Sequence, residues 1–356
     1  MALSSPRRGA TENPAGRFER LHYDEAAEFA QPPAPDEAGP AGPRRTAFFR
    51  DPSRRALSWN QSPDLPFDAS LNPYRGCEHG CSYCFARPTH EYLGLSAGLD
   101  FETKVFVKDE LPKLLRHELS SRRWRPQPVT IGGVTDPYQP IERSARITRR
   151  CLEVFLEFRN PVSLVTKSAL VARDVDLLGE LAGGGAAEVC VSVTTLDREL
   201  HRALEPRSAA PSQRLAAIER LARAGVPVAV LVAPLIPGLN DHEAPAIIEA
   251  AARAGARSAR PIMLKLPHGV KEIFASWLER HYPERKAKVL NRVRAMRGGR
   301  LHDSRFHERQ RGSGLFAEQS AALFAVACRR AGVDAELPPL ATTGFRRPGG
   351  EQLSLL

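Results

Sequence analysis

The sequence has no apolar run long enough to cross a bilayer, which needs about 18 residues or more. Its N-terminal region also lacks the continuous apolar segment of a secretory signal. These two absences exclude a transmembrane protein and disfavour an exported one, so we expect a cytoplasmic protein with no membrane contact. The net charge of +10 over 356 residues favours an acidic partner without identifying one.

Cysteine is also scarce. Six cysteines in 356 residues are too few for a disulfide scaffold in a chain of this length. Three of them lie within eight residues, and the other three are Cys151, Cys190 and Cys328. The separated cysteines fall in apolar or helical stretches, so we interpret each as a small core residue. Bunched thiols in a reducing compartment instead indicate metal or redox chemistry.

Both ends of the chain have few aliphatic residues. Residues 1–55 are rich in proline, alanine, glycine and glutamate, and this composition predicts a disordered arm. Residues 336–356 are similarly rich in proline and glycine and are predicted to form a flexible tail. The remaining segment, residues 56–335, is long enough for one core with a helical extension at its C-terminal end.

Short, valine-rich runs alternate with helical patterns in this core. The predicted strands are residues 129–132, 162–166, 188–194, 228–233 and 259–266. The predicted helices are residues 143–158, 169–181, 213–224 and 241–254. Continuous apolar strands followed by helices indicate a parallel sheet, which right-handed crossovers curl toward a barrel. In such α/β folds the chemistry lies at the C-terminal ends of the strands.

The bunched cysteines read Cys77-Glu-His-Gly-Cys81-Ser-Tyr-Cys84 and follow an extended stretch, residues 70–75. Thiolates are the usual ligands of iron–sulfur clusters. Three ligands on a four-iron cluster leave one iron open to a small molecule. The alternative is a structural zinc site completed by His79 or His90. Zinc usually takes four protein ligands in paired motifs, and the sequence has no second C-x2-C.

The cysteine spacing, with an aromatic residue before the last cysteine, resembles the radical S-adenosylmethionine superfamily. Further segments resemble the subfamily related to spore photoproduct lyase, or DNA repair photolyase-like proteins: residues 70–107, 135–142, 166–168, 192–206 and 233–241. The resemblance covers about residues 63–332. It implies a partial (β/α)6 barrel, a [4Fe–4S] cluster on Cys77, Cys81 and Cys84, and S-adenosylmethionine chelating the open iron. It also implies an electron donor such as flavodoxin or ferredoxin.

The same resemblance assigns cofactor contacts. Gly132 and Gly133 correspond to glycines that allow close backbone approach to the cofactor. The family's usual glutamate is replaced by Val134, so Thr135 or Asp136 is expected to receive the cofactor's amino group.

Lys167 follows an apolar strand and corresponds to a lysine that faces the cofactor carboxylate. A solvated lysine at a strand end is the alternative. Ser192 and Thr194 lie two residues apart on a strand, so they point the same way and suit the ribose hydroxyls. The alternative for Thr194 is a threonine in its favoured strand setting.

One departure from the subfamily limits the transfer of function. Spore photoproduct lyase has a hydrogen-donating cysteine where this sequence has Gly133. We therefore do not carry over the repair of thymine dimers.

Two features favour DNA as a partner. Residues 280–311 carry eleven lysines or arginines against three acidic residues, which indicates either a phosphate-binding surface or a solvated helical face. The last five residues resemble the short peptide that binds the bacterial sliding clamp, although an arbitrary tail is the alternative. They are Gln352, Leu353, Ser354, Leu355 and Leu356.

The sequence thus predicts an enzyme that cleaves S-adenosylmethionine reductively to a 5′-deoxyadenosyl radical, which abstracts hydrogen from an unidentified substrate. Two alternatives remain at this stage. One is a DNA-associated binding protein with a structural or redox-sensing cluster. The other is a radical enzyme that acts on a peptide or a small molecule.

Overall fold

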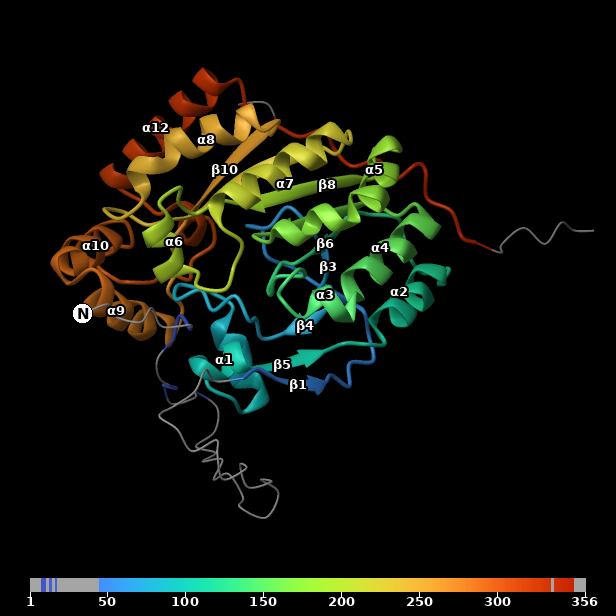
Figure 1. Ribbon diagram of the computed structural model, residues 1–356, viewed down its shortest axis with the longest axis horizontal. Helices are drawn as coiled ribbons and strands as arrows, with labels where there is room; N and C mark the ends of the chain where they lie inside the picture. The colour runs from blue at the N-terminus through green and yellow to red at the C-terminus, as the bar shows by residue number, and fades with distance from the viewer. Residues whose placement is uncertain (1–7, 11–12, 15–16, 18–44, 334–335, 349–356) are drawn as a thin grey trace, which may run out of the picture.

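A seven-stranded sheet forms the centre of the molecule (Figure 1). The computed structural model describes residues 8–10, 13–14, 17, 45–333 and 336–348. The strands lie in the order β10 (Ser258–Met263), β9 (Val228–Leu235), β8 (Ala187–Ser192), β7 (Val162–Thr166), β6 (Val129–Ile131), β3 (Ala69–Leu71) and β2 (Leu57–Trp59). Strands β3 to β10 in this sheet pair in parallel, and β2 pairs antiparallel with β3. Because β10 and β2 are both edge strands, the barrel is open, as the sequence predicted.

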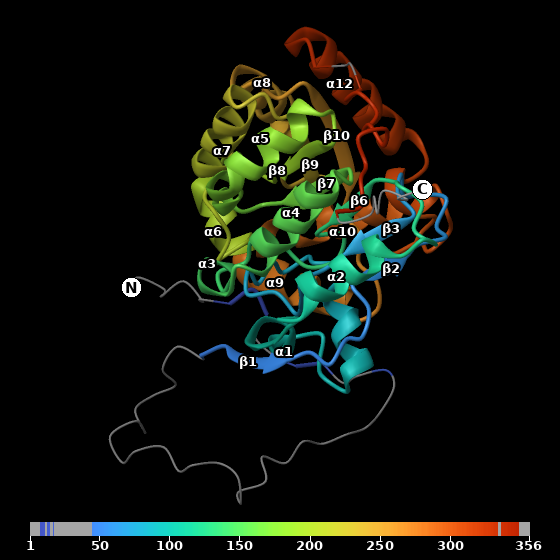
Figure 2. The same cartoon turned by 90° about the vertical axis from the view of Figure 1, so that its right-hand side faces the viewer.

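Helices connect the parallel strands and cover one face of the sheet (Figure 2). They are α2 (Leu111–Ser120), α3 (Glu142–Ala145), α4 (Ile147–Phe158), η3 (Ala169–Asp174), α5 (Val175–Gly183), α6 (Arg198–Leu204), α7 (Pro211–Arg223), η4 (Asp241–Glu243), α8 (Ala244–Arg253) and α12 (Leu315–Ala331). The largest apolar cluster lies between these helices and the sheet, where strand residues such as Val189 and Val230 are fully buried. No helix in the described part of the chain is long and apolar enough to cross a membrane.

The five predicted strands are confirmed, with ends that differ by a few residues. The predicted helix at residues 143–158 is instead divided into α3 and α4. Arg146 has a φ of 51° and therefore interrupts the helical backbone between them. The separated cysteines are buried, as predicted, and form no disulfide bond among the described residues: Cys151 lies on α4, Cys190 on β8 and Cys328 on α12.

The prediction of a disordered arm over residues 1–55 is wrong at its C-terminal end. β1 (Ala47–Arg50) pairs in parallel with β5 (Lys104–Val107), which pairs antiparallel with β4 (Tyr74–Arg75). The side chains of β1 are exposed, so its pairing rests on backbone hydrogen bonds and on the stacking of Phe49 on Phe106, with ring centroids 5.2 Å apart, rather than on burial. A burial pattern could not have revealed such a strand.

The prediction of a flexible tail over residues 336–356 also needs correction, because residues 336–348 pack on the core. Leu337 is buried against Cys190, and Phe345 contacts Phe158 with ring centroids 6.2 Å apart. The backbone nitrogens of Ala341 and Arg346 donate to carbonyls of the core. The predicted clamp-binding peptide, residues 352–356, lies outside the described residues.

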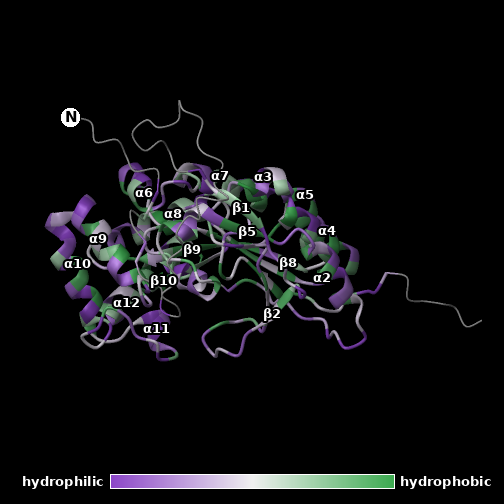
Figure 3. Cartoon of the chain, turned by 90° about the horizontal axis from the view of Figure 1, so that it is seen from below, coloured by the Kyte–Doolittle hydropathy of each residue, from purple (hydrophilic) through white to green (hydrophobic). Residues whose placement is uncertain are grey.

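A helical extension at one end of the molecule faces the cysteine loop. It consists of α9 (Val270–His281), α10 (Pro283–Ala295) and α11 (Glu308–Arg311), which lie together in Figure 3 at the end opposite α2. A second apolar cluster joins this extension to the loop: Cys81 and Tyr83 belong to the same cluster as Phe274 and Trp277. The C-terminal third of the chain therefore closes one side of the loop.

Candidate functional site

The three bunched cysteines lie in a loop after β4, beside the C-terminal ends of the parallel strands. All three thiols are free, with Cys77 and Cys81 buried and Cys84 half-buried. Burial, reinforced by Asp136, raises the pKa of the Cys77 thiol, and burial raises the pKa of Cys81 to about 12. Iron binding at these positions therefore has to displace protons.

The number of free thiols on the loop bears on which metal group it could hold. A structural zinc ion usually takes four protein ligands, and the loop offers three cysteines. A four-iron cluster spreads its ligands, since each thiolate binds a different iron. Three free thiols on one loop therefore fit a [4Fe–4S] cluster.

Buried polar groups fix the shape of this loop. The Arg87 guanidinium, in η2 (Arg87–Leu93), donates two hydrogen bonds of 2.9 and 2.8 Å to the carbonyl of Cys81. The same guanidinium is also paired at 2.5 Å with the carboxylate of Glu102, which lies in α1 (Leu99–Thr103). The Gln139 side chain bridges the loop from the opposite side, donating to the Gly76 carbonyl and accepting from the Glu78 nitrogen.

Residues 8–10, which we call the N-terminal strap, pack over the loop. The backbone nitrogens of Gly9 and Ala10 donate to the Glu102 carboxylate at 3.1 and 2.8 Å. A Cβ atom at Gly9 would collide with the carbonyl oxygen of Gly80, inside the cysteine loop. The strap therefore requires glycine here, and it is linked through Glu102 and Arg87 to Cys81.

Replacing Gly9 by valine is expected to lower the free energy of unfolding by about 1–3 kcal/mol, because the added atoms cannot fit against Gly80. It should also shorten the lifetime of the cluster's visible absorbance in air. Urea unfolding and absorbance decay measure the two effects. Gly183→Val is the control, because nothing lies within 4 Å of its Cβ position. Equal behaviour of the two variants would contradict the role of the strap.

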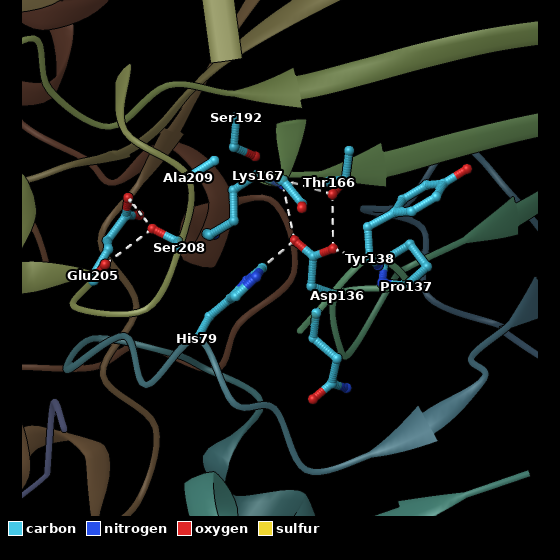
Figure 4. A network of polar contacts seen from close by, with 12 residues as sticks. His79, Asp136, Pro137, Tyr138, Thr166, Lys167, Ser192, Glu205, Ser208 and Ala209 are labelled. Atoms are coloured by element: carbon cyan, nitrogen blue, oxygen red, sulfur yellow. Dashed lines mark hydrogen bonds and ion pairs between the residues drawn. The ribbon is translucent and has the colours of Figure 1, made fainter. Parts of the chain in front are cut away.

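Asp136 occupies the centre of the site (Figure 4). Its carboxylate accepts hydrogen bonds from the Thr166 hydroxyl at 2.7 Å and from the backbone nitrogen of Lys167 at 2.8 Å. It also lies 3.4 Å from His79 Nδ1. Burial alone would raise the pKa of this carboxyl, but the charge of His79 and these hydrogen bonds lower it to about 2. Asp136 thus ties the loop after β6 to the end of β7 and to the cysteine loop.

Lys167 follows β7 and points toward the cysteine loop. Its ammonium lies 5.7 Å from the centre of the Tyr83 ring. Figure 4 shows the residue next to Ser192, with its backbone nitrogen bonded to Asp136. Burial opposes its charge, but the neighbouring Cys81 thiol and Glu205 raise the pKa of the ammonium above its usual value. Lys167 is therefore a positive charge held close to the second cysteine.

Glu205 and Arg214 form a buried ion pair next to this lysine, with both side chains almost completely inaccessible. The Glu205 carboxylate also accepts from the Tyr83 hydroxyl, and Arg214 donates to the Ser192 carbonyl at 3.0 Å. Burial alone would raise the pKa of Glu205, but Arg214 and Lys167 hold it well below its usual range. The pair thus anchors both Tyr83 and the end of β8.

The remaining predicted site residues are two glycines after β6 and two threonines whose hydroxyls are bonded to the protein. Gly132 has a φ of 87° and no room for a Cβ against the carbonyl of Val165, whereas Gly133 meets only Phe67, at 3.6 Å. The Thr135 hydroxyl is already bonded to the Tyr74 carbonyl at 2.8 Å. The Thr194 hydroxyl lies 2.7 Å from Glu205 and 2.8 Å from the Ala233 carbonyl. These two hydroxyls therefore hold the walls of the site together.

Sequence reasoning missed the charged residues that support the site. Glu102, Arg87, Glu205 and Arg214 are all buried, whereas charged residues are normally expected at the surface. Arg87, Glu102 and Glu205 lie within segments used for the family resemblance, but the resemblance assigns them no role. Arg214 lies outside these segments. The spacing of the cysteines gave no indication of which carboxylates and guanidiniums would hold their loop.

Comparison with known families identifies the superfamily of this chain. The profile of the radical SAM superfamily matches residues 71–251, slightly more than half of the 356-residue chain. The chain belongs to the radical SAM superfamily. Enzymes of this superfamily bind a [4Fe–4S] cluster and S-adenosylmethionine, so the prediction of these cofactors is confirmed.

Several relatives and one solved structure extend this result. Uncharacterized proteins of Mycobacterium tuberculosis and Mycobacterium bovis are 40% identical over 222 residues, which are 62% of this chain and 65% of theirs. The match thus spans less than two thirds of these relatives. A radical SAM Nα-GlyT isomerase of Pseudomonas phage M6 is 27% identical over 48% of this chain and 34% of its own.

The fold resembles that of a spore photoproduct lyase variant solved with bound AdoMet and dinucleoside spore photoproduct. The TM-score is 0.50 at 16% identity, over 80% of this chain and 77% of the lyase. This likeness confirms the predicted open barrel and carries no information about the substrate. The contacts that we predicted for individual residues remain predictions.

Proposed function

We propose that this protein is a radical SAM enzyme that generates a 5′-deoxyadenosyl radical and uses it to abstract hydrogen from a substrate. The observation that carries the proposal is the position of Lys167. Its ammonium lies 5.7 Å from the centre of the Tyr83 ring, beside the loop that holds the three free thiols, while its backbone nitrogen donates to Asp136. A family match alone would not require this arrangement of charges.

A [4Fe–4S] cluster held by Cys77, Cys81 and Cys84 supplies one electron for the reductive cleavage of S-adenosylmethionine. The chain's own residues bind and orient that cofactor. Lys167 pairs with its carboxylate as a point charge. Asp136, whose carboxylate already accepts three protein hydrogen bonds, would accept a further one from the cofactor's amino group. A flavodoxin or ferredoxin is the proposed electron donor.

The other predicted contacts are assigned from their surroundings. Gly132 and Gly133 leave the backbone after β6 open to close approach by the methionine end of the cofactor. Ser192 lies beside Lys167 at the end of β8 and is proposed to bind the ribose (Figure 4). Thr135 and Thr194 act as positioning residues, because their hydroxyls are already bonded to the protein.

The first test is 5′-deoxyadenosine formation by anaerobically reconstituted protein with dithionite. In parallel, Lys167→Met is expected to raise the Kd for S-adenosylmethionine about tenfold to a hundredfold, because it removes a hydrogen bond to a charged group. Calorimetric titration measures the Kd, and cluster absorbance shows whether the cluster is retained. Lys113→Met, on the exposed surface of α2, is the control.

No 5′-deoxyadenosine from protein that carries the cluster would reject the proposed reaction. A DNA-associated protein with a structural cluster would then be the better interpretation. Unchanged cofactor affinity in Lys167→Met, with normal cleavage, would reject only the role of this lysine.

DNA is our favoured substrate. The net charge of +10 supports it, because a basic protein favours an acidic partner such as nucleic acid. Gly133 argues against the lyase's own reaction, since no thiol stands at that position. A peptide or a small molecule is the alternative substrate.

A further inference from the structure

The basic stretch at residues 280–311 is less open to anions than its composition indicates. Lys286 pairs with Glu279 at 2.5 Å, Arg292 with Asp241 at 3.5 Å, and Arg305 with Asp303 at 2.6 Å. Arg297 donates to the carbonyl of Leu264 at 3.0 Å. Much of this charge is therefore already compensated within the protein, and a binding site for an anion has to be sought elsewhere.

Lys265 differs from these residues. It follows the C-terminal end of β10, on the same edge of the sheet as Lys167. Among the described residues, no carboxylate lies within ion-pair distance of its ammonium. Burial lowers the pKa of Lys265 to about 8, and the nearby charges of Arg309 and Arg297 contribute. A half-buried cation in such positive surroundings is stabilised by an incoming anion.

An aromatic ring accompanies this lysine. The Lys265 ammonium lies 5.2 Å from the ring centre of Phe85, which directly follows Cys84. The Phe85 side chain is 47% exposed, although it is large and apolar. Phe85 is therefore an exposed ring that follows a proposed cluster ligand and has a cation at its face. Such a ring is suited to stack a planar group.

A second pair of the same kind lies next to the first. The Arg309 guanidinium stands 4.7 Å from the ring centre of Phe306, whose side chain is 52% exposed. Arg309 is held in place by Asp64 and Ser62, and it is near enough to influence the charge of Lys265. Lys265 is thus a cation without an ion-pair partner among the described residues, over the ring that follows Cys84. Arg309, paired with Asp64, is a second cation over an exposed ring.

We propose that Phe85, Lys265, Phe306 and Arg309 bind a nucleotide unit of a single-stranded nucleic acid at the entrance to the cysteine loop. Exposed aromatic rings alternating with cations are the means by which proteins bind single strands, since bases stack and phosphates pair. Phe85 stacks the base beside Cys84, and Lys265 neutralises a phosphate. This inference rests on the proposed function, because it places the substrate next to the site of radical formation.

The test is the binding of a fluorescein-labelled single-stranded 12-mer of mixed sequence by the full-length, cluster-loaded protein, followed by anisotropy without reductant. Lys265→Gln and Phe85→Leu should each weaken binding at least tenfold. Lys113→Gln removes the same charge from the exposed surface of α2 and should change binding less than twofold. Lys265→Arg should retain most of the affinity.

The salt dependence gives an independent measurement. The logarithm of the binding constant falls as the logarithm of the salt concentration rises, and each phosphate contact to a single strand contributes about 0.7 to the steepness of that fall. Lys265→Gln should therefore make the fall shallower by about 0.7. Phe85→Leu should leave the slope unchanged, because it removes stacking and no charge. If Lys265→Gln fails to fold, Phe85→Leu still tests the proposal.

Three outcomes would overturn the inference: no binding of the oligonucleotide by the unaltered protein, equal binding by the Lys265 and Lys113 variants, or full competition by polyglutamate at equal charge. The last outcome would indicate a general affinity for polyanions. Formation of 5′-deoxyadenosine without oligonucleotide is measured in the same preparations. It tests the proposed radical function separately, so failure of either proposal can be recognised.

Discussion

Replacing any one of Cys77, Cys81 or Cys84 by alanine is expected to abolish both the cluster and the formation of 5′-deoxyadenosine. Each thiolate binds a different iron, so the loss of one cannot be compensated by the other two. The reconstituted unaltered protein should contain iron and sulfide near about four each per chain. Elemental analysis, visible absorbance and product chromatography provide the three measurements.

Cys190→Ala and Cys328→Ala are the matched controls. Both cysteines are buried, and both lie outside the loop, on β8 and α12. Their replacement should cost about 1 kcal/mol of stability through lost packing and should leave the iron content unchanged. If a loop variant retained full iron content, or if the controls lost theirs, the assignment of the cluster to this loop would be wrong.

Glu205→Gln is expected to produce the largest change in stability. It leaves the charge of Arg214 buried without its partner, and breaking a buried pair in this way costs about 3–5 kcal/mol. Lys167 loses a neighbouring negative charge at the same time. The decrease in the free energy of unfolding should be measurable by urea unfolding of the apoprotein under reducing conditions.

The ion pair of Glu219 and Arg223 on α7 offers a control with the same chemistry at the surface. Its side chains are 47% and 78% exposed, so Glu219→Gln should change the free energy of unfolding by less than about 0.5 kcal/mol. The double variant Glu205→Gln and Arg214→Met should recover part of the loss, because the charge of Arg214 is then no longer buried without its partner. If the double variant were as unstable as the sum of the single variants, the two residues would not act as a pair.

The sequence predicted the sheet well for a physical reason. A strand covered on both faces is apolar along its whole length, as in Val228–Leu235, and such a run is visible without knowing its neighbours. The cysteine loop was also predictable, since its ligands are close in the sequence. Lys167 could be placed because it directly follows a recognisable strand.

Other features depend on contacts that no local pattern contains. Glu102 accepts hydrogen bonds from backbone nitrogens more than 90 residues away, and no side-chain pattern marks such a donor. The exposed strand β1 pairs through its backbone and through the stacking of Phe49 on Phe106, a contact between residues far apart in the sequence. Lys265 differs from the paired basic residues because no carboxylate of the described residues lies within ion-pair distance of its ammonium, which is a property of the folded chain.

The N-terminal strap has a consequence for the order of biosynthesis. Ala10 packs against Leu99 and Ile273, so its binding site contains residues from both α1 and α9. The ribosome releases residue 10 long before residue 273, and the strap therefore cannot dock until most of the chain has been made. Iron and sulfide have access to the cysteine loop during that interval. We expect cluster insertion to be fastest on chains whose strap has not yet closed.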